Sequence, residues 1–162
     1  MHASAFTTDE ASWMAAALEQ ARLAEASGEV PVGAVVVLEG EIIGAGRNTT
    51  ENSDDPSGHA EINALRAAGA AFGDWRLEES TLVVTLEPCA MCMGAIALAR
   101  VRHVAYGATD PRLGACGSAI DLFDAKLAPH LRSVEGGLMA EECSAILKNF
   151  FRSLRERGNA GY

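Results

Sequence analysis

Two short segments constrain what this chain can fold into more than any other feature of its 162 residues. They are His59-Ala60-Glu61 and Pro88-Cys89-Ala90-Met91-Cys92, and together they offer one imidazole, two thiols and one carboxylate. A zinc ion with three imidazole or thiolate ligands keeps a fourth position open for water. Zinc lowers the pKa of a bound water from about 15.7 to roughly 7. With the histidine and both cysteines as ligands, Glu61 remains available to move protons, so the pattern predicts a catalytic metal site.

The expected ligands are His59, Cys89 and Cys92, and both segments that carry them begin predicted helices. Free N–H groups and partial positive charge at a helix N-terminus favour thiolate over thiol, and thiolate is the form that binds metal. Pro88 fits this position because a residue in the first turn of a helix needs no N–H. Each segment also follows a predicted strand and loop, which is where sites form at the edge of an α/β sheet.

Hydrophobic patterning along the chain predicts alternating helices and strands. Helices are expected over residues 7–27, 59–70, 90–100 and 139–157, and strands over residues 30–38, 41–47, 81–86, 103–107 and 132–135. The polar segment 48–58 and the segment 108–117 are expected to be loops. This alternation predicts an α/β fold of three layers, with helices on both sides of a central sheet.

Length and composition indicate one globular domain over residues 1–162, because a hydrophobic content of 49% is normal for a soluble protein. The longest uncharged apolar run, residues 90–99, is about half of what a bilayer span needs. Residues 1–10 lack the basic and apolar regions of a signal peptide. We therefore expect a cytoplasmic protein without membrane contact and with reduced thiols, in which Cys116 and Cys143 are packing residues.

Charge is distributed unevenly around the formal net value of −9. The first 87 residues hold 15 acidic and four basic side chains, and the rest hold seven acidic and nine basic ones. The basic residues form two groups in the sequence, Lys148, Arg152, Arg155 and Arg157 in one and Arg100, Arg102 and Arg112 in the other. Screening limits each charge to about 8–10 Å, so such groups can bind phosphate on an acidic protein. The C-terminal group is either such a patch or a solvated helix end, and the acidic total argues against strong binding to long duplexes.

A closed zinc site that only stabilises the fold is the alternative to a catalytic one. It needs a fourth ligand, and Cys116 is the only plausible cysteine. Its neighbours, residues 114–117, are typical of a flexible loop, and a closed site leaves the His-x-Glu spacing unexplained. A non-catalytic, zinc-stabilised RNA-binding module would likewise make Glu61 dispensable. The open site therefore remains the preferred interpretation.

Beyond these motifs, the chain resembles the bacterial tRNA-specific adenosine deaminases of the zinc-dependent cytidine and deoxycytidylate deaminase superfamily. The matching segments are Glu29–Val35, His59–Arg66, Thr85–Cys92, Tyr106–Asp110, Gly114–Ser118, Glu141–Cys143 and Phe150–Arg152. The H-x-E and P-C-x-x-C motifs are shared by the superfamily. The Gly-Ala-x-Gly-Ser loop and the Phe-Phe-Arg sequence are more particular to the tRNA branch.

The resemblance implies a cytidine-deaminase-like α/β/α fold with a central mixed sheet of about five strands. It implies a homodimeric hydrolase with one zinc ion per subunit, which deaminates adenosine to inosine at the wobble position of a tRNA anticodon stem–loop. The implied metal ligands are His59, Cys89 and Cys92, and Glu61 is the implied catalytic residue. Substrate binding is implied for Asn48 at the flipped purine, for Asp110 at the nucleotide backbone, and for Ala60, Pro88, Phe150, Phe151 and Arg152.

Anticodon loops are already unpaired, so a base there can be turned into an active site, where aromatic side chains can stack on it. Ordinary helix packing remains the alternative for at least one of the two phenylalanines. Three residues depart from the family pattern, namely Pro111, Leu113 and Cys116. They bear on tRNA affinity and choice more than on the reaction. A small-molecule deaminase of guanine or cytidine remains the alternative within the superfamily.

Overall fold

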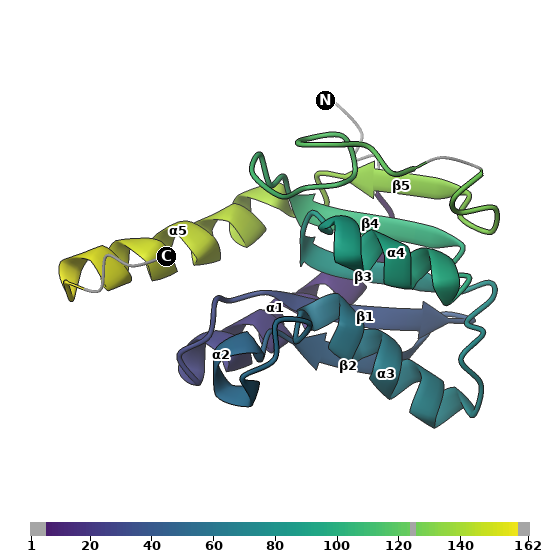
Figure 1. Cartoon of the computed structure of the whole chain (residues 1–162), viewed down its shortest axis with the longest axis horizontal. Helices are drawn as coiled ribbons and strands as arrows, with labels where there is room; N and C mark the ends of the chain where they lie inside the picture. Colours follow the sequence, from purple (N-terminus) through teal and green to yellow (C-terminus); the bar gives the residue numbers. More distant parts are fainter. Residues whose placement is uncertain (1–5, 124–125, 159–162) are drawn as a thin grey trace.

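The computed structural model describes residues 6–123 and 126–158, and helices cover both faces of a five-stranded sheet (Figure 1). The helices are α1 (Thr8–Ala26), α2 (Thr50–Ser53), α3 (Ala60–Phe72), α4 (Ala90–Leu98) and α5 (Ala140–Glu156). The strands are β1 (Gly33–Leu38), β2 (Glu41–Arg47), β3 (Thr81–Leu86), β4 (His103–Ala108) and β5 (Ser133–Gly136). No helix in the described part of the chain is long and apolar enough to cross a membrane.

The sheet is mixed, with the strand order β2-β1-β3-β4-β5. Strand β1 pairs antiparallel with both β2 and β3, whereas β3, β4 and β5 run parallel to one another. Glu39 and Gly40 join β1 to β2 with positive φ angles of 51° and 81°. This conformation is typical of two-residue hairpin turns, because it matches the twist of the strands. The predicted mixed sheet of about five strands is therefore confirmed.

Alternate residues of the central strands face opposite layers, as the two-residue repeat of a strand requires. On one side, Val36 of β1 lies in the same core cluster as Ala64 of α3 and residues of α4. On the other side, Val35 lies in a cluster with Met14 of α1 and Cys143 of α5. The predicted three-layer arrangement is confirmed, with α3 and α4 sharing one face of the sheet.

Two glycines of β2 allow α3 to approach the sheet closely. A Cβ atom on Gly44 would lie 2.5 Å from the backbone nitrogen of Ala68, and one on Gly46 would collide with the backbone nitrogen of Ala64. Glycine is needed here because the helix backbone occupies the space of a side chain. This contact sets the height of α3 above the sheet and hence the position of its first turn, which follows His59.

One predicted boundary and one predicted loop differ from the structure, and the other elements lie within two residues of their predicted ranges. Strand β1 begins at Gly33 rather than residue 30, because the Val32 N–H donates to the Val30 carbonyl at 2.9 Å and Pro31 has no N–H. Residues 50–53, predicted as loop, form a helical turn whose first N–H groups find side-chain acceptors. The prediction of one domain over residues 1–162 extends beyond the described residues and stays a prediction.

Candidate active site

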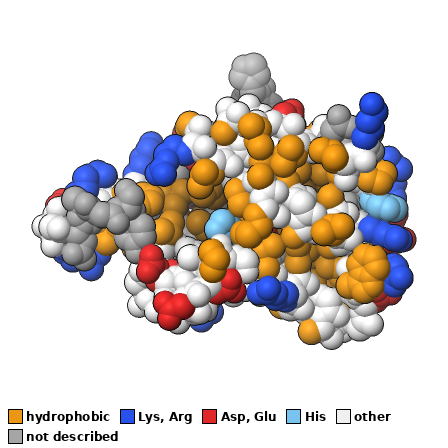
Figure 2. Space-filling model, viewed as in Figure 1, with side chains coloured by type: hydrophobic (Ala, Val, Ile, Leu, Met, Phe, Trp, Pro, Cys, Tyr) orange, Lys and Arg blue, Asp and Glu red, His pale blue; other side chains and the backbone are white. Residues whose placement is uncertain are grey.

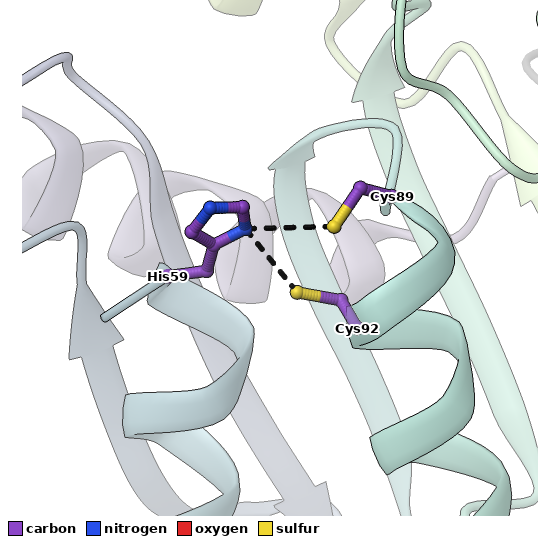
Figure 3. Close-up of side chains that lie close together, drawn as sticks. All are labelled: His59, Cys89 and Cys92. Carbon is purple, nitrogen blue, oxygen red and sulfur yellow. Dashed lines mark hydrogen bonds between the residues drawn. The ribbon is translucent and has the colours of Figure 1, made fainter. Parts of the chain in front are cut away.

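His59, Cys89 and Cys92 come together between the first turns of two helices (Figure 3). His59 is the N-cap residue of α3, Cys89 is the N-cap residue of α4, and Cys92 lies in the first turn of α4. The Nδ1 atom of His59 lies 3.5 Å from each of the two Sγ atoms. All three donor atoms lie within 4.8 Å of one another. The structure thus brings together the three residues that the sequence predicts as metal ligands.

The donor set and its spacing fit a zinc ion. Tetrahedral zinc, with Zn–N of about 2.05 Å and Zn–S of about 2.3 Å, would separate nitrogen and sulfur donors by about 3.6 Å. The separations found here are 3.5 Å. Cys116, which a closed site would need, lies outside the group, and its Sγ contacts the Sδ of Met93 at 3.5 Å. Within residues 6–123 and 126–158, no further group of His, Cys, Asp and Glu side chains is assembled in this way.

Cys89 and Cys92 carry their charge unequally. Hydrogen bonds from the Cys92 thiol and then from His59 lower the pKa of Cys89 to about 4. Hydrogen bonding to Cys89 and burial raise the pKa of Cys92 in turn. The free N–H groups at the start of α4 also favour a thiolate there. These contacts favour a thiolate at Cys89, and thiolate is the form that binds metal.

Glu61 lies in the first turn of α3 and is only 4% exposed. Burial raises the pKa of its carboxyl group, although the nearby His59 opposes the shift. The side chain lines the same cavity as His59 and Cys89. A buried carboxyl group that is free of the metal can both accept and release a proton, which is the property of a general acid and base.

A cavity of about 520 Å³ opens beside these residues. Its wall is built by the segment before β1, the segment after β2, the first turns of α3 and α4, the loop after β4, and one side of α5. Helix α5 contributes Leu147 and Phe151, which lie one turn apart. Of the residues that the sequence predicts for substrate binding, those on the cavity wall are Asn48, Ala60, Asp110 and Phe151.

The other residues predicted for substrate binding have different surroundings. Pro88 is buried, and its carbonyl accepts a hydrogen bond from the Ala115 N–H at 2.8 Å. Phe150 is only 5% exposed and packs edge-to-face against Phe151, with ring centroids 5.4 Å apart. Arg152 is exposed and donates to the Asn149 side chain at 3.2 Å. The Phe-Phe-Arg sequence therefore divides into a buried ring, a ring on the cavity and a surface cation.

Asp110 shapes the loop that follows β4. Its Oδ1 atom accepts hydrogen bonds from the backbone N–H groups of Arg112 and Leu113 at 3.0 and 3.2 Å, and its carbonyl accepts from the Gly114 N–H at 2.9 Å. The side chain thus holds a tight turn at the cavity wall.

Two buried carboxylates on the cavity wall, Glu29 and Glu87, were missed by the sequence analysis. Glu29 accepts hydrogen bonds from backbone N–H groups of α2, and Glu87 accepts one from Ser118. Both lie in segments that resemble the family, but neither belongs to a motif with ligand spacing. The sequence shows each of them only as an acidic residue next to an apolar strand. The same pattern occurs at exposed strand ends, so it does not reveal that these two carboxylates are buried.

Comparison with known proteins identifies the family of this chain. The model of the MafB19-like deaminase family matches residues 8–155. The tRNA-specific adenosine deaminase of Bacillus subtilis is 43% identical over 153 residues, which cover 94% of this chain and 95% of that protein. The tRNA-specific adenosine deaminase of Haemophilus influenzae is 48% identical over 141 residues, which cover 86% of this chain and 82% of that protein.

Two solved structures are similar in fold. A tRNA:A34 deaminase, studied for A-to-I editing at the wobble position of transfer RNA, has a TM-score of 0.80 at 43% identity. The match covers 84% of this chain and 99% of the chain of that deaminase. The guanine deaminase from Nitrosomonas europaea has a TM-score of 0.76 at 26% identity and covers 86% of this chain and 83% of its own. The expected cytidine-deaminase-like fold is thereby confirmed. With these matches along most of its length, the chain belongs to the MafB19-like deaminase family and to the tRNA-specific adenosine deaminases.

Proposed function

We propose that this chain is a zinc-dependent deaminase that hydrolyses adenosine to inosine and ammonia at the wobble position of a tRNA anticodon. The observation that carries the proposal is one cavity in which the His59, Cys89 and Cys92 group lies beside the buried carboxyl of Glu61. Relatives named tRNA-specific adenosine deaminases, 43 and 48% identical, support adenosine in tRNA as the substrate. A tRNA substrate also supports a cytoplasmic location.

One zinc ion per subunit would be held by His59 Nδ1 and by the sulfur atoms of Cys89 and Cys92. When bound, zinc lowers the pKa of a water ligand and so makes hydroxide available near neutral pH. The three ligands stand on the first turns of α3 and α4, which pack on the same face of the sheet. Their separation is therefore set by rigid elements, as a preorganised site requires.

Glu61 would move the protons of the reaction. It takes a proton from the attacking water as the water oxygen bonds to the ring carbon that bears the amino group. It gives this proton to the adjacent ring nitrogen. It then takes the second proton of the former water from the new hydroxyl group and gives it to the amino group, which leaves as ammonia while the carbonyl forms. The raised pKa of the buried carboxyl suits both directions of transfer.

The flipped nucleotide would be held by residues on the cavity wall. Asn48 and Ala60 stand near the ligands, Asp110 holds the loop after β4, and Phe151 extends from α5. An enzyme that acts on a base must take it out of the stack, and an anticodon loop offers unpaired bases. Stacking on an aromatic ring is worth roughly 1–3 kcal/mol per base, and Phe151 offers such a ring.

The RNA backbone would lie along α5. This helix projects from the body of the protein (Figure 1), and Figure 2 shows Lys and Arg side chains gathered around it. Its exposed basic residues are Lys148, Arg152, Arg155 and Arg157. Because charges act over about 8–10 Å, this patch can attract anticodon phosphates although the chain as a whole is acidic.

A homodimer would form through the exposed apolar face of α3 and α4, where Figure 2 shows hydrophobic side chains gathered. Trp75, Leu98 and Leu127 are 56, 77 and 65% exposed and line one broad depression on this face. Contiguous apolar surface of this kind marks a protein contact. Sedimentation should give a dimer for the wild-type protein and a monomer for Leu98→Asp, and a monomeric wild-type protein would reject the homodimer.

Inosine formation in an anticodon stem–loop with adenosine at the wobble position tests the proposed function. Free adenosine, guanine and cytidine are assayed beside it, with and without a chelator. Inosine formed only in the stem–loop, and lost with the chelator, supports the proposal. Turnover of a free base or nucleoside with an inert stem–loop would reject it in favour of a small-molecule deaminase, the activity of the Nitrosomonas europaea relative.

A further inference from the structure

Glu29 is a carboxylate without solvent exposure on the wall of the active-site cavity, and the mechanism above does not use it. Burying an ionised carboxylate is costly unless hydrogen-bond donors compensate it. Here the Asn52 N–H donates to Oε1 at 2.7 Å, and the Glu51 N–H donates to Oε2 at 3.2 Å. Both oxygens therefore hold the backbone of the segment that follows β2.

The same segment carries Asn48. The Asn48 Nδ2 atom donates to the carbonyl of Val30 at 3.3 Å, and Oδ1 accepts from both the N–H and the hydroxyl of Thr50 at 3.3 and 2.6 Å. An amide oxygen has two lone pairs, so Oδ1 is fully used. If the amide were reversed, its NH2 group would face the Thr50 N–H and its oxygen would face the Val30 carbonyl, and neither pair can form a hydrogen bond. The hydrogen-bond network therefore determines the orientation of the Asn48 amide. Asn48 is left with one N–H for a ligand.

We infer that Glu29 is a positioning residue, which ties residues 48–52 to residues 27–30 and thereby fixes the N–H that Asn48 can offer to the substrate. The inference rests on the proposed function, in which Asn48 contacts the base. Two further hydrogen bonds brace this contact, from Asn52 Nδ2 to the Ser27 carbonyl and from the Asn48 N–H to the Val32 carbonyl, both at 3.1 Å. Glu29 lies between Ser27 and Val32 in the sequence, and its carboxylate adds two hydrogen bonds to the same contact.

The charge of Glu29 matters because hydrogen bonds to an ionised acceptor are stronger than those to a neutral one. In Glu29→Gln, one acceptor oxygen remains and the amide NH2 faces a backbone N–H that it cannot satisfy. Loss of one charge-assisted hydrogen bond should raise KM for the stem–loop about tenfold, with a smaller change in kcat. Zinc content should not change, because His59, Cys89 and Cys92 are not hydrogen-bonded to this segment through their donor atoms.

The kinetic test uses zinc-loaded wild-type protein, Glu29→Gln, Asn48→Ala and the double variant. Glu25→Gln, which changes an exposed carboxylate at the end of α1, is the matched control and should behave as wild type. If Glu29 acts through Asn48, the effect of Glu29→Gln on KM should largely disappear in the Asn48→Ala background. Additive effects, a wild-type KM for Glu29→Gln, or a wild-type KM for Asn48→Ala would each overturn the inference.

Amide hydrogen exchange of the RNA-free protein supplies a readout that does not depend on the substrate. In Glu29→Gln the Glu51 and Asn52 amides should exchange at least about tenfold faster, while the amides of β3 keep their protection. Unchanged exchange at both amides would overturn the inference. A wild-type protein that forms no inosine would reject the proposed function, and the exchange result would still decide whether Glu29 holds the segment.

Discussion

The Ser118 hydroxyl donates a hydrogen bond to Glu87 Oε1 at 2.7 Å, while the second oxygen of Glu87 is buried and without a hydrogen-bond partner in the described part of the chain. Glu87 stands two residues before Cys89, a proposed metal ligand. The loop that carries Ser118 pairs with the same segment, because Cys89 forms an antiparallel bridge with Gly114. The hydrogen bond thus ties residues 114–118 to the strand end that carries this proposed ligand.

Gly114→Ala should disturb this contact, because a methyl group there would collide with the Glu87 carboxylate. Overpacking of this kind costs about 2 kcal/mol, so we expect a fall of that size in the free energy of unfolding, together with weaker zinc retention. Urea unfolding and zinc analysis measure both. Gly94→Ala is the control, since its Cβ would meet nothing within 4 Å, and wild-type stability for Gly114→Ala would contradict the prediction.

Glu61→Ala should retain zinc and lose nearly all activity. General acid–base catalysis raises reaction rates by about 10²–10⁴-fold, so kcat should fall by at least about 10²-fold. Inosine formation and zinc content are measured on the same preparation. The control is Glu41→Gln, which alters an exposed carboxylate of β2, and normal turnover by Glu61→Ala would exclude the proposed role.

Cys89→Ser should lower zinc affinity strongly, whereas Cys116→Ser should bind zinc as the wild type does. The reason is that Cys89 belongs to the ligand group and the Cys116 sulfur contacts Met93 instead. Zinc per chain, measured after competition with a chelator, distinguishes the two variants. Equal zinc loss in both would indicate a closed site with four protein ligands.

Phe150→Ala and Phe151→Ala should impair different properties although the residues are neighbours. Phe150 is buried, and truncating such a ring costs about 3–5 kcal/mol in the free energy of unfolding. Phe151 lines the cavity, and its truncation should weaken stem–loop binding by about 1–3 kcal/mol with a smaller loss of stability. Denaturant unfolding and RNA titration of both variants test this contrast. If the two variants lost equal stability and equal RNA affinity, the prediction would be refuted.

Stability should fall as the pH rises above about 10, in part because of Tyr106. Burial, and then the nearby Glu87 charge, raise the pKa of Tyr106 to about 12. Between pH values of about 10 and about 12, the Tyr106 phenol is ionised in the unfolded chain but still protonated in the native state. The unfolded state is therefore favoured as the pH rises through this range. Tyr106→Phe should show a smaller decrease in the free energy of unfolding over this range. Identical pH profiles for both proteins would argue against the shift.

Local pattern alone was enough to predict many parts of this protein. Strands β2 and β3 occupy the predicted ranges 41–47 and 81–86, because apolar runs bounded by turns are properties of neighbouring residues. The positions of His59 and of the Cys89–Cys92 segment at helix starts were predictable for the same reason. The short α2 was not, because its second and third N–H groups depend on Glu29, a residue distant in the sequence.

Motif spacing and hydrophobic periodicity act over a few residues, so they predicted every element except α2, together with the three layers and the side chains able to hold zinc. The burial of Glu29 and Glu87 on the cavity wall, and the presence there of Phe151 instead of Phe150, depend on long-range packing. Helical spacing places both rings on α5, but the direction each one faces depends on how that helix lies against the sheet. That arrangement results from packing between residues far apart in the chain, which no local pattern contains.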